Sequence, residues 1–411
     1  MSKRKIEQSI TVLAPIVFTD DAGYIATNDR YGRLIDSFAS EFAKVIIPAP
    51  FADRSDKAFF PGEKSLYTYR IAHANVEIRP LRISSRIMRP IRKWMVWLHR
   101  ISPIVRSIRQ SDFVYIVMPG FTPSLAVFIS RVLHRPYILY FGSDWDTFAP
   151  FMARWGRGNP LLGLYRSLSR KAERYAVRGS LFTLVTGEML RERLEPFSQC
   201  IVETVPMIPL QRGDFFERED TCETAPIHLL SVGALEPRKG ARDLIEALSI
   251  IRAEGIEAEC SFVGGGDPNY IEGLSDLVQE LGIKEHVHFA GYITNYDAIL
   301  KTYRKADVFV LPTHSEGFPR VLYEAMSQSL PIVTTNIPSI SAMLEHREHA
   351  LLVPPGQPMA IVSAVLTITK DPVLRKRLIN KGRSFAEERI GEDTTGDQIF
   401  RILDEISGEP M

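Results

Sequence analysis

The residues with the clearest chemical potential lie in the stretch 311–326, where two glutamates have seven residues between them. An apolar run, Val308–Leu311, predicts a strand that delivers a loop with Glu316, and Pro319 suits the start of the helix that follows. Glu324 would then lie about one and a half turns into that helix. Two carboxylates placed in this way can bind two hydroxyl-bearing parts of one ligand, such as a sugar and a ribose.

Simpler explanations exist for part of this stretch. Glu316 can serve as a first-turn residue of the helix, and the N–H groups of Gly317 and Phe318 can begin the helix as well as hold phosphate or sugar oxygens. Glu324 is harder to explain as a surface charge, because apolar residues flank it on both sides in the sequence. A buried carboxylate requires hydrogen-bonding partners.

A second group of residues could bind phosphate. The apolar run that ends in Gly233 leads into a short loop, and a helix is expected to begin near Gly240. The unpaired N–H groups of a helix N-terminus attract anions, and Arg238 and Lys239 add two cations beside them, an arrangement that suits a diphosphate. An ordinary strand-to-helix turn with solvated charges explains the same spacing.

Two further glycine turns follow. Three glycines, Gly264–Gly266, come after an apolar run and resemble a phosphate turn, but Asp267 and Pro268 interrupt the full fingerprint, and a tight turn remains the alternative. The next run ends at Gly291 beside Tyr292, where backbone groups and an apolar wall could hold a nucleobase.

The elements that would position these residues alternate between short apolar runs and longer amphipathic stretches. This alternation predicts βαβ units and parallel sheets with strands buried on both faces. In such sheets ligands bind at the carboxyl ends of the strands, where the motifs above fall. The expected strands are 10–18, 44–47, 113–117, 137–141, 181–185, 228–232, 259–263, 287–290, 308–311 and 332–334, and the clearest helices are 241–253, 270–281 and 320–327.

The length of 411 residues predicts two domains. We place the first at 1–205, a linker at 206–226, the second domain at 227–390 and a C-terminal helix at 391–411. The linker assignment rests on three prolines, an acidic run and the lack of any periodicity. The terminal helix has apolar residues at three- and four-residue spacing, and we expect it to pack back on the first domain.

The net charge of +1 conceals a strong asymmetry, because residues 1–200 contain 30 Lys and Arg but 17 Asp and Glu, which leaves 20 and 32 for the remainder. A basic first half and an acidic second half favour different binding partners.

Three scattered cysteines exclude a disulfide framework and favour a reducing compartment. No run of about 20 apolar residues predicts a spanning helix, and the first apolar run does not resemble a signal peptide. We therefore expect a cytoplasmic protein.

The segment Arg86–Arg109 interleaves arginine, aliphatic residues, Trp94 and Trp97. Tryptophan favours the membrane interface and arginine favours anionic headgroups, so we hypothesise a peripheral contact with the inner face of a membrane. A second basic stretch spans Arg154–Arg178. A helix packed on the sheet with solvated arginines is the alternative. Nucleic acid is not expected as a partner, because no nucleic-acid-binding motif accompanies the charge.

In chain order, the motifs R-K-G, G-G-G, H-F-A-G and E-G-F-P-x-x-x-x-E resemble the retaining glycosyltransferases of family 4. These have the GT-B fold, an α/β architecture of two doubly wound Rossmann-like domains that face each other across a cleft. The resemblance continues through Pro331–Thr335 and Leu351–Gly356 and covers the second half of the chain. It implies that the first domain binds the acceptor and the second binds a nucleotide-sugar.

The resemblance implies the activity as well. The enzyme would move a sugar from a UDP- or GDP-sugar to a glycan or lipid-linked acceptor, with retention at the anomeric carbon and no metal or other cofactor. Cell-surface polysaccharide or glycolipid biosynthesis would be the setting. Arg238 and Lys239 would bind the donor diphosphate, Glu316 the sugar hydroxyls and Glu324 the ribose. The implied donor-binding set is Gly233, Arg238, Lys239, Gly264, Gly265, Tyr292, Glu316, Gly317, Phe318, Pro319 and Glu324, and the implied catalytic set is Glu316, Lys239, Arg238 and Asp144.

The first half departs from the family pattern. A glycine-rich loop usually follows the first strand, whereas this chain offers Gly23 there. Many members carry a His-Gly-x-Asp element, but here Phe141 replaces the histidine before Gly142, and Asp144 would take the polar role near the sugar. Asp144 and Asp146 also form a D-x-D pattern, which binds a metal–diphosphate in a different fold, and we expect no metal here.

Two alternatives remain open. The first is a nucleotide-sugar epimerase of the same architecture, which sugar transfer to an added acceptor would exclude. The second is a non-catalytic nucleotide-sugar-binding protein, suggested by Phe141, which donor hydrolysis or transfer would exclude.

Overall fold

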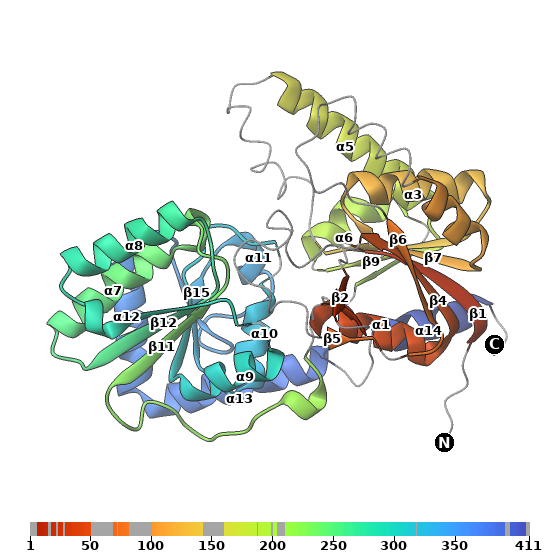
Figure 1. Ribbon diagram of the computed structural model, residues 1–411. Coiled ribbons are helices and arrows are strands. Elements are labelled where there is room, and N and C mark those ends of the chain that lie inside the picture. The colour runs from red at the N-terminus through yellow and green to blue at the C-terminus, as the bar shows by residue number, and fades with distance from the viewer. Residues whose placement is uncertain are drawn as a thin grey trace. The chain divides into compact units, whose positions relative to one another are not determined.

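The computed structural model describes residues 6–14, 18–21, 24–27, 29–50, 69–71, 73–81, 101–142, 160–186, 188–198, 200–203, 210–293, 295–317, 319–390 and 395–407. The chain forms two compact units (Figure 1). Unit 1 comprises Met1–Pro209 together with Asp393–Met411, and unit 2 comprises Leu210–Glu392. Each unit is described by itself below.

Unit 1 is built on a seven-stranded sheet whose neighbouring strands are all parallel, in the order β10-β9-β8-β7-β1-β4-β6. The strands are continuous apolar runs; every residue of β8, for example, is buried. A second, antiparallel sheet has the order β2-β3-β5. The bounds are β1 Ile6–Leu13, β2 Thr19–Asp21, β3 Tyr24–Thr27, β4 Phe42–Pro50, β5 Tyr69–Arg70, β6 Val76–Leu81, β7 Phe113–Met118, β8 Tyr137–Phe141, β9 Phe182–Val185 and β10 Ile201–Glu203.

Helices cover both faces of this sheet. On one face lie α1 (Asp29–Glu41) and the C-terminal helix α14 (Thr395–Ser407), whose buried residues share one core with the strands. Gly396 allows the two helices to touch, since a Cβ there would lie 2.1 Å from the carbonyl oxygen of Ser37. On the other face lie the helical residues 101–109, α3 (Phe121–Val132) and α5 (Pro160–Arg178), which share a second core. The short helix α6 spans Glu188–Leu194.

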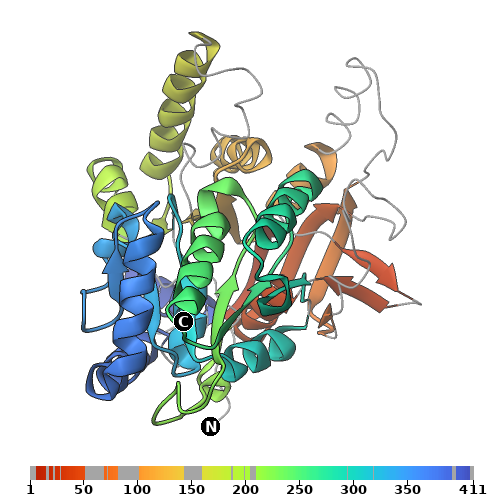
Figure 2. The ribbon, with the colours of Figure 1, turned by 90° about the vertical axis from the view of Figure 1, so that its left-hand side faces the viewer.

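Unit 2 contains a six-stranded parallel sheet in the order β13-β12-β11-β14-β15-β16. The strands are β11 Ile227–Val232, β12 Ala258–Val263, β13 Val287–Gly291, β14 Val308–Leu311, β15 Ile332–Thr335 and β16 Leu351–Val353. One face carries α7 (Ala241–Ala253), α8 (Pro268–Glu280) and α12 (Pro358–Lys370), and the other carries α9 (Tyr296–Lys305) and α10 (Arg320–Ser327). The helix α13 (Pro372–Arg389) contacts both α12 and α10, and its Leu374 and Leu378 belong to the core of the first face. Figure 2 turns unit 2 toward the viewer. Both units are therefore doubly wound α/β structures.

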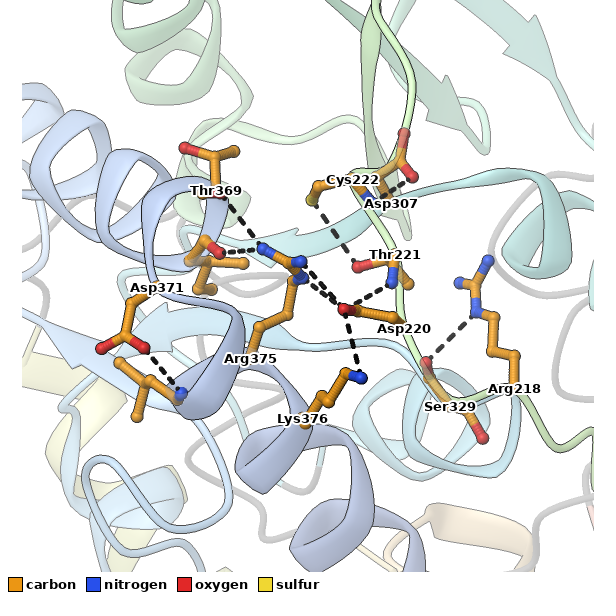
Figure 3. A network of polar contacts seen from close by, with 12 residues as sticks. Arg218, Asp220, Thr221, Cys222, Asp307, Ser329, Thr369, Asp371, Arg375 and Lys376 are labelled. Carbon is orange, nitrogen blue, oxygen red and sulfur yellow. Dashed lines mark hydrogen bonds and ion pairs between the residues drawn. The ribbon is translucent and has the colours of Figure 1, made fainter.

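Residues 210–226 belong to unit 2, although the sequence places them in a linker. Arg218 and Asp220 attach this segment to the unit by hydrogen bonds. Asp220 accepts hydrogen bonds from Nε of Arg375 at 2.5 Å and from Nη2 of Arg375 at 3.0 Å (Figure 3). Polar contacts of Arg218 and Asp220 therefore fix this segment on unit 2, where composition alone suggests a free connection. Arg218 donates to the carbonyl oxygens of Ser329 at 3.3 Å, Arg304 at 3.1 Å and Ala306 at 2.7 Å.

The basic segment Arg86–Arg109 is described in part. Residues 86–100 lie outside the described residues, whereas residues 101–109 are helical and pack on the unit 1 sheet through Ile104 and Ile108. None of the helices in the described ranges is both long and apolar enough to span a bilayer.

Candidate functional site

Two neighbouring strands of unit 2 bring a lysine and a glutamate together. Lys239 lies on a short 3-10 turn, Pro237–Lys239, that follows β11, and Glu316 lies in the loop that follows β14, which pairs with β11. The Lys239 ammonium and the Glu316 carboxylate form an ion pair between residues 77 positions apart. Their side chains are only 18% and 8% exposed. Each charge therefore compensates the other in a place where an unpaired charge would be costly.

Arg238 joins the same two loops. Its Nη1 donates to the carbonyl oxygen of Ser315 at 3.2 Å, and its Nε donates to Glu236 at 2.8 Å. In return, its own carbonyl oxygen accepts the N–H of His314 at 2.8 Å and the hydroxyl of Thr313 at 3.2 Å. The guanidinium group remains partly exposed. Arg238 therefore holds the two loops together and keeps a cation at the carboxyl edge of the sheet.

A histidine–aspartate pair, which the sequence does not indicate, reinforces this junction. His314 Nε2 lies 2.6 Å from Oδ2 of Asp243 in the first turn of α7, where a carboxylate is favoured by the helix dipole. The Asp243 side chain is 14% exposed and that of His314 is 42% exposed. Because 71 positions separate the two residues, no local pattern could reveal the contact.

Gly240 allows the N-terminus of α7 to approach β14. Its φ is +70°, and a Cβ at this position would lie 2.0 Å from the carbonyl oxygen of Pro312. A side chain would therefore push the helix N-terminus, with its anion-attracting N–H groups, away from the Glu316 loop.

The predicted glycine turns lie side by side at the ends of β11, β12 and β13. The N–H of Gly264 donates to the carbonyl of Gly291 at 2.8 Å, and a Cβ on Gly264 would lie 2.0 Å from the carbonyl oxygen of Gly233. The half-exposed ring of Tyr292 covers Gly265, where a Cβ would lie 2.2 Å from a ring carbon. Three strand ends thus form one surface of bare backbone beside an aromatic ring, a suitable wall for a nucleoside.

Glu324 is the buried carboxylate of the site. It is 9% exposed on α10, and the hydroxyl of Tyr303 on α9 donates to its Oε2 at 2.8 Å. Burial and the adjacent carboxylate hold the pKa of Tyr303 well above its ordinary value, so the phenol keeps the proton that it donates. Tyr303, a residue that the sequence does not single out, is therefore one partner of the buried Glu324.

The remaining predicted residues divide between the units. In unit 2, Gly317 is exposed beside Glu316, and the buried Pro319 immediately precedes α10. In unit 1, Gly142 follows the carboxyl end of β8. Gly23, Asp144 and Phe318 lie outside the described residues. The structure therefore places the described residues of the predicted donor site on unit 2, along the carboxyl edge of its sheet and on α10.

One protein family matches a large part of unit 2. Residues 215–385 match the family model described as glycosyl transferases group 1. The chain is 25% identical over 251 residues to an alpha-D-kanosaminyltransferase of Streptomyces kanamyceticus, a match that covers 58% of this chain and 64% of that protein. It is 29% identical over 173 residues to a phosphatidyl-myo-inositol mannosyltransferase of Mycobacterium leprae, covering 42% and 44%. The chain thus matches less than two thirds of the length of these relatives.

Solved structures resemble the whole chain. A sucrose-phosphate synthase from Thermosynechococcus elongatus has a TM-score of 0.68 at 16% identity, covering 98% of this chain and 100% of the other. The HepE protein of Anabaena in complex with UDP-glucose has a TM-score of 0.66 at 16% identity, covering 97% and 100%. At this identity the likeness concerns the fold. The chain therefore has the GT-B fold, and its residues 215–385 match the family model of the glycosyl transferases group 1.

Proposed function

We propose that this protein is a retaining glycosyltransferase that moves a sugar from a nucleoside diphosphate sugar to a glycan or lipid-linked acceptor. Unit 2 binds the donor and unit 1 supplies the acceptor-binding surface. The observation that supports this most strongly is the partly buried pair of Lys239 and Glu316 at the carboxyl ends of two adjacent strands. This edge is where open α/β sheets bind ligands.

The two charges of the pair suit the two ends of the bond that breaks. When the anomeric carbon separates from the diphosphate, the bonding electrons remain on the phosphate oxygen. Lys239 and the partly exposed Arg238 lie where they can neutralise that charge, together with the N-terminus of α7. Glu316 accepts hydrogen bonds from the sugar hydroxyls. The acceptor oxygen forms its new bond on the face that the diphosphate leaves, and the acceptor hydroxyl gives its proton to the departing phosphate oxygen.

Donor binding would exchange partners within this pair. Lys239 turns from Glu316 to a phosphate, and Glu316 turns from Lys239 to hydroxyl groups. Neither group is then left as an unpaired charge, which limits the desolvation cost of the exchange. The carboxylate of Glu324, held by Tyr303, accepts hydrogen bonds from the ribose, and the backbone wall at Gly264 and Tyr292 borders the nucleoside.

The relatives suggest a first choice of donor and a setting. Structures of the Anabaena protein contain UDP, UDP with glucose, and UDP-glucose, which favours a UDP-sugar over a GDP-sugar for the first assay. Other relatives are named as lipopolysaccharide core and amylovoran biosynthesis glycosyltransferases. We therefore place the reaction in cell-surface polysaccharide or glycolipid biosynthesis, on the cytoplasmic side.

Kinetics of two site variants test the proposal. Donor consumption is measured over a panel of UDP- and GDP-sugars with added acceptors, and the anomeric configuration of the product is read by NMR. We expect Lys239→Ala to lower kcat by roughly a hundredfold with a smaller change in KM. Glu324→Ala should chiefly raise the KM for the donor. Lys284→Ala, at an exposed cation in the same unit, is the control.

Three results would contradict parts of the proposal. If both site variants had wild-type kinetics, Lys239 and Glu324 would not belong to the donor site. A product of inverted anomeric configuration would refute retention. The absence of donor turnover by the wild-type protein across the panel would refute the transferase function itself.

A further inference from the structure

Three helices on one face of the unit 1 sheet carry charge of nearly one sign. The helical residues 101–109, α3 and α5 contain eight Lys and Arg and one acidic residue, Glu173. That acid is not available to the surface, because its side chain is 4% exposed and lies 3.3 Å from Nη2 of Arg193. The eight basic residues are Arg106, Arg109, Arg131, Arg166, Arg170, Lys171, Arg174 and Arg178.

The opposite face of the same sheet has the reverse composition. Its helices, α1 and α14, contain three arginines and six acidic residues, of which Glu41 is buried. Among these described helices of unit 1, the basic excess therefore lies on the face that carries α3 and α5. The proposed donor-binding residues lie in unit 2, so donor binding does not account for this face.

The helices α3 and α5 expose large apolar side chains. Phe128 and Val132 lie one turn apart on α3 and are 55% and 58% exposed, and Leu168 and Tyr175 lie two turns apart on α5 and are 56% and 45% exposed. They are four of the eleven large apolar side chains that the described residues expose. Single exposed apolar residues are ordinary, but four on two packed helices among many cations form a surface with a preference for a partner.

Direct contacts join the two helices into one surface. Nη1 of Arg131 on α3 donates to the carbonyl oxygen of Tyr175 on α5 at 2.8 Å, and the guanidinium carbon lies 4.1 Å from the centre of the Tyr175 ring. The hydroxyl of Tyr137 on β8 donates to the carbonyl of Ala176 at 2.7 Å and fixes α5 on the sheet. Figure 1 shows α3 and α5 as neighbours on this side of unit 1.

We propose that the outer face of α3 and α5 is a docking surface for a bilayer that contains anionic lipids. Phe128, Val132 and Leu168 enter the boundary between headgroups and acyl chains, and Tyr175 lies at the headgroup level. Lys171 and the arginines around it contact lipid phosphates. Exposed apolar side chains among cations favour a lipid partner over nucleic acid, because binding to the phosphates of a nucleic acid requires cations and not exposed aliphatic side chains. This inference does not depend on the proposed transfer reaction.

Vesicle co-sedimentation of the full chain tests the surface. The purified protein is mixed at low ionic strength with vesicles of phosphatidylcholine alone, or with about one third phosphatidylglycerol. One variant, Phe128→Ser with Leu168→Ser, removes apolar contact, and a second, Lys171→Glu, reverses a charge. The matched controls lie in unit 2: Met359→Ser with Val373→Ser, which are 56% and 71% exposed, and Lys284→Glu. Thermal unfolding of each variant confirms that it is folded.

We expect the wild-type protein to sediment with anionic vesicles and to remain in solution with phosphatidylcholine alone. Both α3–α5 variants should lower the partition coefficient roughly fivefold or more, and the controls should bind like wild type. Failure of the wild-type protein to bind anionic vesicles would overturn the inference. So would wild-type binding by the apolar variant, since the attraction would then be one of charge alone. If the protein bound vesicles but transferred no sugar, the docking surface would be supported and the proposed function would be refuted.

Discussion

The hydrogen bond between Tyr303 and Glu324 provides a sharp test of the donor site. Tyr303→Phe removes one hydroxyl and preserves the ring, which packs against Phe309 with 5.5 Å between ring centres. The Glu324 carboxylate then loses a donor that lies 2.8 Å from its Oε2, in a place where it is 9% exposed. The change therefore separates the placement of Glu324 from the packing of α9 on the sheet.

The expected cost follows from the charge and burial of the acceptor. A hydrogen bond to a charged group contributes about 1.5–3 kcal/mol, compared with about 1 kcal/mol for a neutral pair. We therefore expect unit 2 to lose about 2 kcal/mol of unfolding free energy. At roughly 2–4 °C per kcal/mol for a domain of this size, its Tm should fall by about 4–8 °C.

Tyr137→Phe in unit 1 is the matched control. This tyrosine is also buried, and burial raises its pKa to about 12 although the adjacent Arg131 acts in the opposite direction. Its hydroxyl donates at 2.7 Å to the neutral carbonyl oxygen of Ala176. Its loss should cost about 1 kcal/mol in unit 1. If Glu324 binds the ribose, Tyr303→Phe should also weaken nucleotide binding roughly tenfold, because the carboxylate is no longer held in one orientation. Tyr137→Phe should leave that affinity unchanged.

Differential scanning calorimetry and titration of UDP by isothermal calorimetry provide the two measurements. Equal losses in Tyr303→Phe and Tyr137→Phe would refute the argument that the buried charge strengthens the first bond. A destabilised Tyr303→Phe protein with wild-type affinity for the nucleotide would show that Glu324 is a structural carboxylate and would remove it from the donor site.

Two further predictions concern unit 2. Gly264→Ala should lower its unfolding free energy by more than about 2 kcal/mol in chemical denaturation, since φ is +139° and the new Cβ would lie 2.0 Å from the carbonyl oxygen of Gly233; Gly273→Ala, in open space on α8, should instead stabilise by up to about 1 kcal/mol. Burial raises the pKa of Asp220, but hydrogen bonds from Arg375 and the Thr221 amide outweigh it and the net pKa is lowered. A carboxyl with a lowered pKa contributes stability above its unfolded pKa, and this contribution is lost as the pH falls through the folded pKa. The unfolding free energy of unit 2 should therefore decrease below about pH 4, and Asp220→Asn should reduce that pH dependence. If the denaturation midpoint of Asp220→Asn changed with pH as it does in the wild type, Asp220 would not be the group responsible.

The strongest local patterns predict the elements best. The helices 241–253 and 320–327 and the strand 308–311 are predicted with the bounds of α7, α10 and β14. Each combines a clear period with glycine or proline at an end. The strand Val76–Leu81 is missed, because Glu77, Arg79 and Pro80 break its apolar character. That composition belongs to the edge of a sheet, and β6 is the last strand in the order.

The contacts that complete the site lie beyond local pattern. Spacing places Lys239 and Glu316 each at the carboxyl end of a strand. Their pairing depends on β14 lying next to β11 in the sheet, although β12 and β13 separate these two strands in the chain. Tyr303 is 21 positions from Glu324, and its hydroxyl could equally have faced solvent as far as the sequence shows. Sequence therefore predicts which residue types meet at the edge of the sheet, and topology decides the partners.

The distribution of charge on unit 1 has a consequence for orientation that the sequence total could not supply. A half-chain excess of basic residues is compatible with any arrangement, but here the helices on one face of the sheet contain eight basic residues and one buried acid. The helices on the other face contain three basic and six acidic residues, of which Glu41 is buried. At an anionic surface each accessible cation contributes about 1 kcal/mol within a Debye length, while the acidic face of α1 and α14 is repelled. Attraction and repulsion then select the same side of unit 1, so the docked orientation requires no specific lipid pocket. Added salt should weaken that selection before it removes the apolar contact of Phe128 and Leu168.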